Sequence, residues 1–514
     1  MIAWLKKQRV EWWVWAFFVV CVYAVMCVHE PWFDEQQSWQ IAKTASWHDM
    51  LFVLPHYEGH PPFWHILLAL PARMGISWQI GLRAVGLLFS SCAAWLLIFK
   101  SPFPRWFRCL VPFTFFLFYQ YSVIVRPYSI MMLLLFLLAI VFPDKDKKPG
   151  LFVGLLAGLC ACHVYGIAMA GGIACAWLLE LKENATLATF CKKLIHQKQF
   201  YCLLGLLIWA CILVVWVCPH PDTFATHLKV SSSLWRRILY VLFILPADAV
   251  ITSVLKEVTL QKASLGGIGF FIASGMGVIL WVEIFYLLPR KYWGYLALPY
   301  IFLAVLFFSY SSRHHIGLWL LLVLFVGWIG WHNKITPKRK LTQILNFETM
   351  VACLLASCIW TLGSVYWDSR TETFPAKQAL LFLQKNNLLG NRVIMAWWKI
   401  DEWNISQTNL VAYGTELSFY AGKNILTNFN MDSTKEYRVH RLQPLSESYK
   451  VLQAWKRKGM PDVLIGGVCL ECVFEGENLI DQYIPGFKMQ TYDLWKHYSP
   501  RLFGDYIFIR KELS

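Results

Sequence analysis

A polar segment directly after the first apolar run is rich in side chains that could do chemistry. Residues 29–65 hold the adjacent acids Asp34 and Glu35, three further acids, and five of the chain's 14 histidines. A carboxylate beside an acceptor hydroxyl can take its proton as the oxygen attacks an activated carbon, which is general-base catalysis. We therefore interpret this segment as the working site, with Asp34 and Glu35 as catalytic candidates.

Cationic, imidazole and phenol side chains recur at later turns that are predicted to share one side of the membrane. Where a lipid phosphate leaves, the anion needs such partners, and arginine can make two parallel hydrogen bonds to a phosphate. Charges at membrane depth tend to line functional cavities. We expect donor-phosphate binding by Arg126, Arg313, His314 and His315, and substrate binding by Glu58, His60, Tyr128, His163 and Tyr165.

Each of these assignments has a structural alternative. Arg126 could be an interfacial anchor whose charged end snorkels to water. His163 and Tyr165 could form a satisfied pair inside the bundle. The charges of Asp34 and Glu35 could serve only to stabilise the first turn of an interfacial helix.

A divalent metal could bind to His56, Glu58 and His60, since all three residue types ligate metals. A spacing of two residues puts them on one side only if this piece of chain is extended. Solvated loop histidines are the alternative. No cofactor is otherwise indicated.

Long apolar runs make the rest of the chain a scaffold. The chain is 57% hydrophobic and 15% charged, and runs near the roughly 20 residues that cross a bilayer recur between residues 12 and 366. The sequence predicts a polytopic α-helical membrane protein with about eleven spans, at 12–28, 80–99, 109–125, 127–142, two within 151–181 that turn near His163, 201–218, 266–289, 292–310, 315–332 and 344–366. Residues 29–79 form the first outer loop, with short interfacial helices, and 238–247 are expected to be re-entrant or interfacial.

The net charge of +16 reports topology. Lysine and arginine collect in short loops between spans, which stay on the cytoplasmic side. The N-terminus is therefore expected in the cytoplasm, and the charge gives no reason to invoke nucleic acid.

Residues 367–514 are expected to form an extracytoplasmic α/β domain after the membrane domain of 1–366. An amphipathic helix is predicted at 375–389 and another at 446–458, with strands at 392–397, 462–466, 487–495 and 505–510. Cys469 and Cys472 form a lone CxxC, which is a local disulfide or half of a zinc site.

Several of these motifs resemble one enzyme family. Phe33-Asp34-Glu35 in the first outer loop is followed by Gly59-His60-Pro61-Pro62, then by Arg126-Pro127-Tyr128 and His163 at later turns. This layout is similar to bacterial relatives of the protein O-mannosyltransferases and the aminoarabinose transferase, which have the GT-C fold. The Arg313-His314-His315-Ile316-Gly317 turn also resembles a segment of related membrane proteins. The likeness covers residues 12–366 in layout and is tightest over 33–66.

The resemblance implies an inverting glycosyltransferase at the outer face of a bacterial inner membrane. It implies a polyprenyl-phosphate sugar donor, a lipid, glycan or protein acceptor, Asp34 as the base and Glu35 as its support. The chain departs from the common pattern at His60 and Phe63-Trp64, where small polar and Leu-Tyr-Tyr residues are usual.

Two other classes of function use the same features differently. A lipid or lipid-linked-sugar flippase should show paired halves and broken spans near the midplane, and the sequence shows neither. A non-catalytic assembly protein would not need Asp34. The sequence has no Walker or dinucleotide glycine motif, which argues against nucleotide-driven transport.

Overall fold

The structure is a computed structural model, and it describes residues 9–182, 195–221, 223, 233–250, 268–309, 311–331, 340–370, 376–390, 394–398, 415–426, 462–467, 487–490 and 505–510. The chain divides into two compact units. The first, here called the membrane unit, comprises Met1–Val28, Leu82–Trp216 and Lys229–Tyr366. The second, here called the loop unit, comprises His29–Gly81, Val217–Leu228 and Trp367–Ser514. The segment between the first two apolar runs thus groups with the C-terminal residues.

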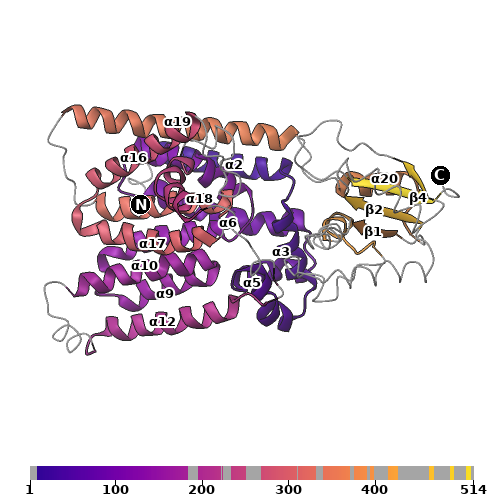
Figure 1. Ribbon diagram of the computed structural model, residues 1–514, viewed down its shortest axis with the longest axis horizontal. Coiled ribbons are helices and arrows are strands. Elements are labelled where there is room, and N and C mark those ends of the chain that lie inside the picture. The colour runs from indigo at the N-terminus through magenta and orange to yellow at the C-terminus, as the bar shows by residue number, and fades with distance from the viewer. Residues whose placement is uncertain are drawn as a thin grey trace. The chain divides into compact units, whose positions relative to one another are not determined.

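The membrane unit is built from helices (Figure 1). In chain order they are α2 (Arg9–Val28), α6 (Trp78–Lys100), α7 (Arg105–Leu110), the 3-10 helix η2 (Val111–Phe113), the π-helix η3 (Phe116–Val123), α8 (Tyr128–Val141), η4 (Phe142–Asp144), α9 (Pro149–Cys162), α10 (Val164–Leu181), α12 (Lys198–Val217), α14 (Leu234–Leu239), η5 (Tyr240–Ile244), α15 (Leu245–Asp248), α16 (Ile268–Leu287), η7 (Arg290–Tyr292), α17 (Trp293–Ser309), α18 (Arg313–Trp331) and α19 (Lys340–Arg370).

The protein is a helical membrane protein. Among the described residues, seven helices are long and apolar enough to cross a bilayer, namely Val10–Val28, Trp78–Lys100, Val164–Leu181, Lys198–Val217, Arg290–Phe308, Arg313–Trp331 and Glu348–Arg370. Three shorter apolar helices, Tyr128–Asp144, Pro149–Cys162 and Phe271–Leu287, fall on further predicted spans.

The predicted span at 109–125 is not one helix. The segment is divided among α7, η2 and η3, and Pro112 interrupts regular α-helical hydrogen bonding. All eight residues of η3 are buried. A predominantly apolar run therefore marks the protein interior here, and not a straight helix in lipid.

The predicted turn at His163 is confirmed. α9 ends at Cys162, α10 begins at Val164, and His163 between them has an extended backbone with φ −165° and ψ 156°. The ring of His163 caps α10, because its Nδ1 accepts a hydrogen bond of 3.3 Å from the Tyr165 backbone N–H.

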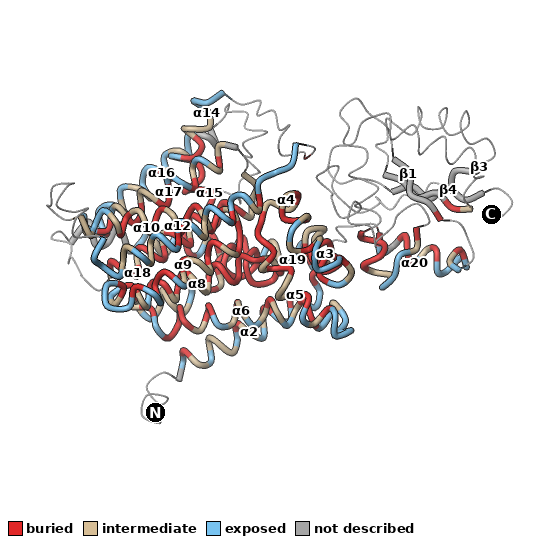
Figure 2. Tube along the Cα trace, turned by 90° about the horizontal axis from the view of Figure 1, so that it is seen from below, coloured by how far each residue is buried: buried red, intermediate tan, exposed pale blue. Residues whose placement is uncertain are grey.

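α18 lies at the centre of the membrane unit and α12 at its edge. Within the apolar stretch of each helix, 72% of the residues are buried in α18 and 17% in α12. The buried residues follow the inward faces of the helices (Figure 2). α10 packs between α9 and α17 (Figure 1). Gly172 makes that contact close, since a Cβ there would lie 2.2 Å from the Pro299 Cα.

The loop unit begins with four short helices, α3 (Phe33–Thr44), the π-helix η1 (Asp49–Val53), α4 (Pro55–Glu58) and α5 (Phe63–Arg73). α3 and α5 lie side by side. Arg73 at the end of α5 donates hydrogen bonds of 2.9 and 2.7 Å to the carbonyls of Ala42 and Ala45, so the C-terminal end of α3 is fixed by a cation.

The C-terminal residues of this unit form a four-stranded sheet in the order β1-β2-β4-β3. The strands are β1 (Ile394–Trp398), β2 (Val463–Gly467), β3 (Phe487–Gln490) and β4 (Asp505–Arg510). β1 and β2 are parallel, and β4 pairs antiparallel with both β2 and β3. The apolar face of α20 (Ala376–Lys385) shares a hydrophobic core with Ile394 and Val463. The predicted helix at 446–458 and the Cys469–Cys472 pair lie outside the described residues.

Candidate functional site

α3 holds the acid pair in its first turn. Trp32 has an extended backbone, and Glu35 Oε2 accepts a hydrogen bond of 2.8 Å from the Trp32 N–H. A glutamate at the third helical position that satisfies this N–H is half of a capping box. Asp34 is half-buried and Glu35 is 1% exposed. The two neighbours therefore differ, because Glu35 fixes the start of the helix and Asp34 is the more accessible carboxylate.

His29 lies between the carboxylates of Glu35 and Asp368, and all three residues belong to the loop unit. Its Nε2 lies 3.0 Å from Glu35 Oε2, and its Nδ1 lies 2.7 Å from Asp368 Oδ2 near the end of α19. All three side chains are buried. Burial alone would lower the pKa of His29, but the two carboxylates outweigh it and raise the pKa to about 10. His29 is therefore an imidazolium between two acids at neutral pH.

A second group of ligand-type side chains follows α4. One ligand atom from each of Glu58, His60 and His65 lies within 4.8 Å of the others. Gly59, with φ +70°, ends α4 in a left-handed conformation, and this lets the chain turn sharply between Glu58 and His60. His65 lies one turn later, in α5, and its ring centroid is 5.1 Å from that of His60.

His65 is unusual within this group. Both of its ring nitrogens are buried without a hydrogen-bond partner among the described residues. Burial, with a smaller contribution from His60, holds the pKa of His65 well below its usual value. It is therefore a neutral imidazole, which is the form that ligates a metal.

The acid pair and this group are linked through α3. Gln37 Nε2 donates a hydrogen bond of 2.5 Å to Glu58 Oε1. Asp34 and Gln37 are three residues apart in a helix and so lie on one face. Asp34 therefore stands on the face of α3 that carries the contact with Glu58.

His56 is not part of this group, so the ligand-type side chains that lie together differ from the predicted set of His56, Glu58 and His60. Residues 55–58 are helical and not extended, so the spacing of two does not align the three side chains. The His56 Nδ1–H donates a hydrogen bond of 2.7 Å to the Cys218 carbonyl, and its ring centroid lies 4.4 Å from that of His220. His65 takes its place.

Comparison with known families gives no assignment. No family model and no curated protein matches this chain.

In the membrane unit, residues from three separate turns come together. Arg126 Nη1 lies 3.5 Å from His314 Nε2, and the guanidinium carbon lies 5.7 Å from the centre of the Tyr128 ring. The Tyr128 ring centroid is 5.6 Å from those of both His163 and His314. These contacts join the starts of α8, α10 and α18.

His315 closes this group on the other side. Its ring centroid lies 4.3 Å from that of Tyr165, 5.8 Å from that of His163 and 4.2 Å from that of His314. We call the six residues the imidazole cluster; its members are Arg126, Tyr128, His163, Tyr165, His314 and His315. Arg313 opens α18 one residue before His314 and is half-buried.

Two residues that sequence reasoning missed hold the imidazole cluster in place. Tyr121 donates a hydrogen bond of 2.8 Å to the His314 carbonyl. Ser312 Oγ lies 2.9 Å from His314 Nε2 and 3.2 Å from His315 Nδ1. Arg126 and His314 are half-buried, whereas Tyr128, His163, Tyr165 and His315 are buried. Arg126 and His314 are therefore the members that can offer hydrogen bonds to an anion from outside the cluster.

In the loop unit, sequence reasoning counted His29 and His65 among the histidines of the working segment without giving them a role, and it did not consider Gln37 and Asp368. A signal existed for two of them. His29 directly follows the first apolar run, and Asp368 lies at the end of the last one. Both predicted spans end on the same side of the membrane, so these two ionisable residues are expected at a similar depth.

Proposed function

We propose that this protein is an inverting glycosyltransferase that moves a sugar from a polyprenyl-phosphate carrier to an acceptor at the outer face of a bacterial inner membrane. Its N-terminus is cytoplasmic and its C-terminal residues are extracytoplasmic in this proposal. Its transmembrane architecture is of the GT-C type.

The observation that carries the proposal is the imidazole cluster. Six residues drawn from sequence positions 126 to 315 meet at the ends of three membrane helices. Simple packing of apolar helices does not require a guanidinium and three imidazoles together, and such groups inside a membrane protein usually mark a functional cavity. The phosphate of a lipid-linked donor is an anion at the depth of the membrane where these helix ends lie. Donor binding therefore explains why these residue types occur together.

Asp34 is assigned as the general base. The acceptor hydroxyl gives its proton to the Asp34 carboxylate as its oxygen attacks the anomeric carbon, and the bond from that carbon to the carrier phosphate breaks. The electron pair of the broken bond leaves with the phosphate, where Arg126 and the imidazoles stabilise the charge. Attack opposite the leaving group inverts the anomeric configuration.

Glu35 supports Asp34 by fixing the start of α3. Its carboxylate is already used by the Trp32 N–H and by His29. It is therefore a positioning residue in this proposal, and the two adjacent acids have separate tasks.

A divalent metal is proposed at Glu58, His60 and His65. Two imidazoles and a carboxylate are a donor set that suits zinc or a similar transition metal. The hydrogen bond from Gln37 would orient the Glu58 carboxylate from the second coordination shell. Such an ion would add positive charge to the face of α3 that carries Asp34.

Turnover of radiolabelled polyprenyl-phosphate hexoses in membranes tests the proposal. Asp34→Asn keeps the size of the side chain and removes the base, and Asp49→Asn, in the same loop, is the matched control. We expect the wild type and the control to release lipid phosphate and Asp34→Asn to release almost none. Equal turnover in all three would exclude Asp34 as the base. Labelled lipid that crosses the bilayer without phosphate release would favour a flippase instead.

A further inference from the structure

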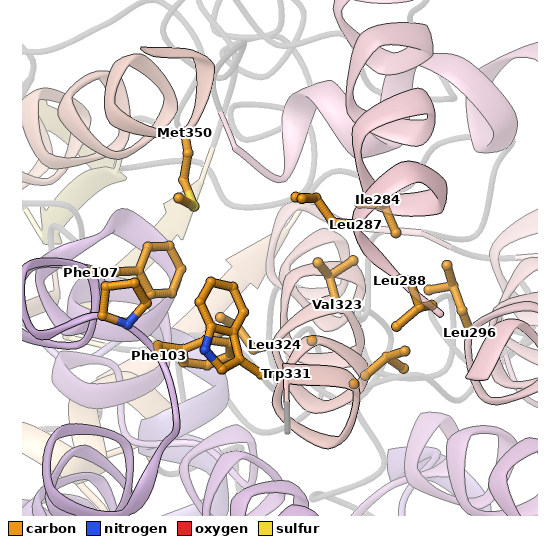
Figure 3. A pocket seen from close by; sticks show the side chains of 14 residues that line it. Phe103, Phe107, Ile284, Leu287, Leu288, Leu296, Val323, Leu324, Trp331 and Met350 are labelled. Carbon is orange, nitrogen blue, oxygen red and sulfur yellow. The ribbon is translucent and has the colours of Figure 1, made fainter. Parts of the chain in front are cut away.

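An apolar cavity of about 150 Å³ lies among the helices of the membrane unit (Figure 3). Its walls come from α16, α17, α18, α19 and the segment that leads into α7. Side chains such as Phe103, Leu288, Val323, Trp331 and Met350 point into it. All of its lining residues are hydrophobic, proline or glycine. This volume suits a section of one hydrocarbon chain, and among the lining side chains only the Trp331 indole N–H can donate a hydrogen bond.

The length of α18 separates the cavity from the imidazole cluster. His315 lies in the first turn of α18 and Trp331 ends it. Sixteen residues of α-helix at 1.5 Å each place the two about 24 Å apart along the axis. The α18 residues that line the cavity run from Val323 to Trp331, so the cavity extends from about 12 to about 24 Å along the axis from His315, towards the other end of the helix.

Basic residues lie next to cavity-lining segments in the sequence. Arg290 and Lys291 form the short turn between α16 and α17, two helices that line the cavity, and both are exposed. Arg105 directly follows the lining residue Pro104. Short basic segments of this kind mark the cytoplasmic side, where anionic lipids attract lysine and arginine.

We propose that this cavity binds one acyl chain of an anionic phospholipid from the cytoplasmic leaflet, with Arg290 and Lys291 at the headgroup. An apolar cavity of this size stays dry, and leaving it empty forfeits packing contacts. Leu287, which lines the cavity, is 43% exposed and gives the chain a route from the bilayer. The polyprenyl carrier is not the occupant, because its phosphate belongs at the imidazole cluster in the proposed function. The exclusion of the polyprenyl carrier rests on the proposed function, whereas the apolar cavity and the basic turn beside it do not.

Lipid retention by a filled cavity is the first test. Gly327 lines the cavity, and a Cβ there would make only ordinary contacts of 3.6 Å with Phe103, so Gly327→Leu projects into the space. Gly205→Leu, on the exposed face of α12 with nothing within 4 Å, is the matched control. Native mass spectrometry of the full-length protein should find an anionic phospholipid on the wild type and the control. Gly327→Leu should lose it at least tenfold, and retention at the wild-type level would overturn the proposal.

The headgroup contact is tested by exposed residues whose substitution leaves the helices intact. Arg290→Gln with Lys291→Gln should shift the retained lipid from anionic to zwitterionic species by at least fivefold. Lys147→Gln with Lys148→Gln, two exposed lysines in another basic loop, should change nothing. An unchanged lipid profile in the first pair would overturn the proposal. So would polyprenyl phosphate as the main retained species in the wild type.

Discussion

His29 Nε2 lies 3.0 Å from Glu35 Oε2, with both side chains almost completely buried. The contact joins the residue after the first membrane helix to the first turn of the helix that carries Asp34. A buried pair of this kind is costly to break, since removing one partner leaves an uncompensated charge. The position of the proposed base therefore depends on a proton held by His29.

The stability of the protein should fall as the pH rises through the range in which His29 loses its proton. The pKa of His29 is about 10 in the folded protein against an ordinary value of 6.5. Because the folded-state pKa is raised, the stabilisation is complete below pH 6.5 and is lost as the pH rises towards 10. One proton corresponds to a slope of about 1.4 kcal/mol per pH unit within that window.

Thermal unfolding in detergent between pH 6 and pH 10 measures this slope. Other groups also titrate there, so the informative quantity is the difference between the wild type and His29→Gln. The variant should be less stable at pH 6.5, and the gap should narrow as the pH rises. A gap that is constant with pH would show that the proton on His29 does not stabilise the fold.

Asp34 and Glu35 should fail in different ways when each carboxylate becomes an amide. Asp34→Asn should lower turnover by about 100- to 10,000-fold, the usual contribution of a general base, and should leave the unfolding temperature unchanged. Glu35→Gln leaves the His29 charge less compensated and should destabilise the protein by about 3 kcal/mol.

Measuring both properties for each variant separates the two roles. The change in turnover for Glu35→Gln should be smaller than for Asp34→Asn once folded protein is counted. If Asp34→Asn unfolds as readily as Glu35→Gln, Asp34 is a structural residue and the assignment of the base is wrong.

Sequence patterns predicted the membrane helices well where one apolar run makes one straight helix. Residues 201–218 were expected to span, and α12 covers Lys198–Val217. The same criterion failed at 109–125, because hydrophobicity does not distinguish a lipid-facing helix from a buried segment broken at Pro112. The turn at His163 was predictable because a run of 31 residues, 151–181, exceeds the length of one span.

The sequence predicted which residue types belong to the candidate site better than it predicted which residues contact one another there. Topology alone indicated that Arg126, His163 and His315 share a membrane face, and the structure brings them into one cluster. The partnership of His29 with Asp368 spans 339 residues, and no local pattern encodes it. The replacement of His56 by His65 also required the fold, because it depends on whether residues 55–58 are helical or extended.

Arg126 should contribute to donor binding more than to folding. Arg126→Lys keeps the charge but loses the planar fork that suits a phosphate, so kcat/KM for the polyprenyl-phosphate donor should fall about 10- to 100-fold, as expected for a charged hydrogen bond. Arg83→Lys is the control, since Arg83 lies outside the imidazole cluster and its Nη1 lies 3.9 Å from Cys27 Sγ. An equal effect of both substitutions would point to a general loss of packing.

Metal binding should depend on His65 and not on His56, although both lie in the first outer loop. Purified protein should contain about one zinc or similar ion per chain by elemental analysis. His65→Phe should lose it, because Phe fills the buried site without offering a ligand. His56→Gln should retain it, since that side chain bonds to the Cys218 carbonyl instead.

Added zinc at 100 times its Kd should stabilise the metal-free wild type by about 2.7 kcal/mol and leave His65→Phe unaffected. The pattern has a direct physical basis, because His65 is the histidine whose two ring nitrogens are buried without hydrogen bonds among the described residues. Metal retained by His65→Phe, or lost from His56→Gln, would mean that the ligands are other than Glu58, His60 and His65.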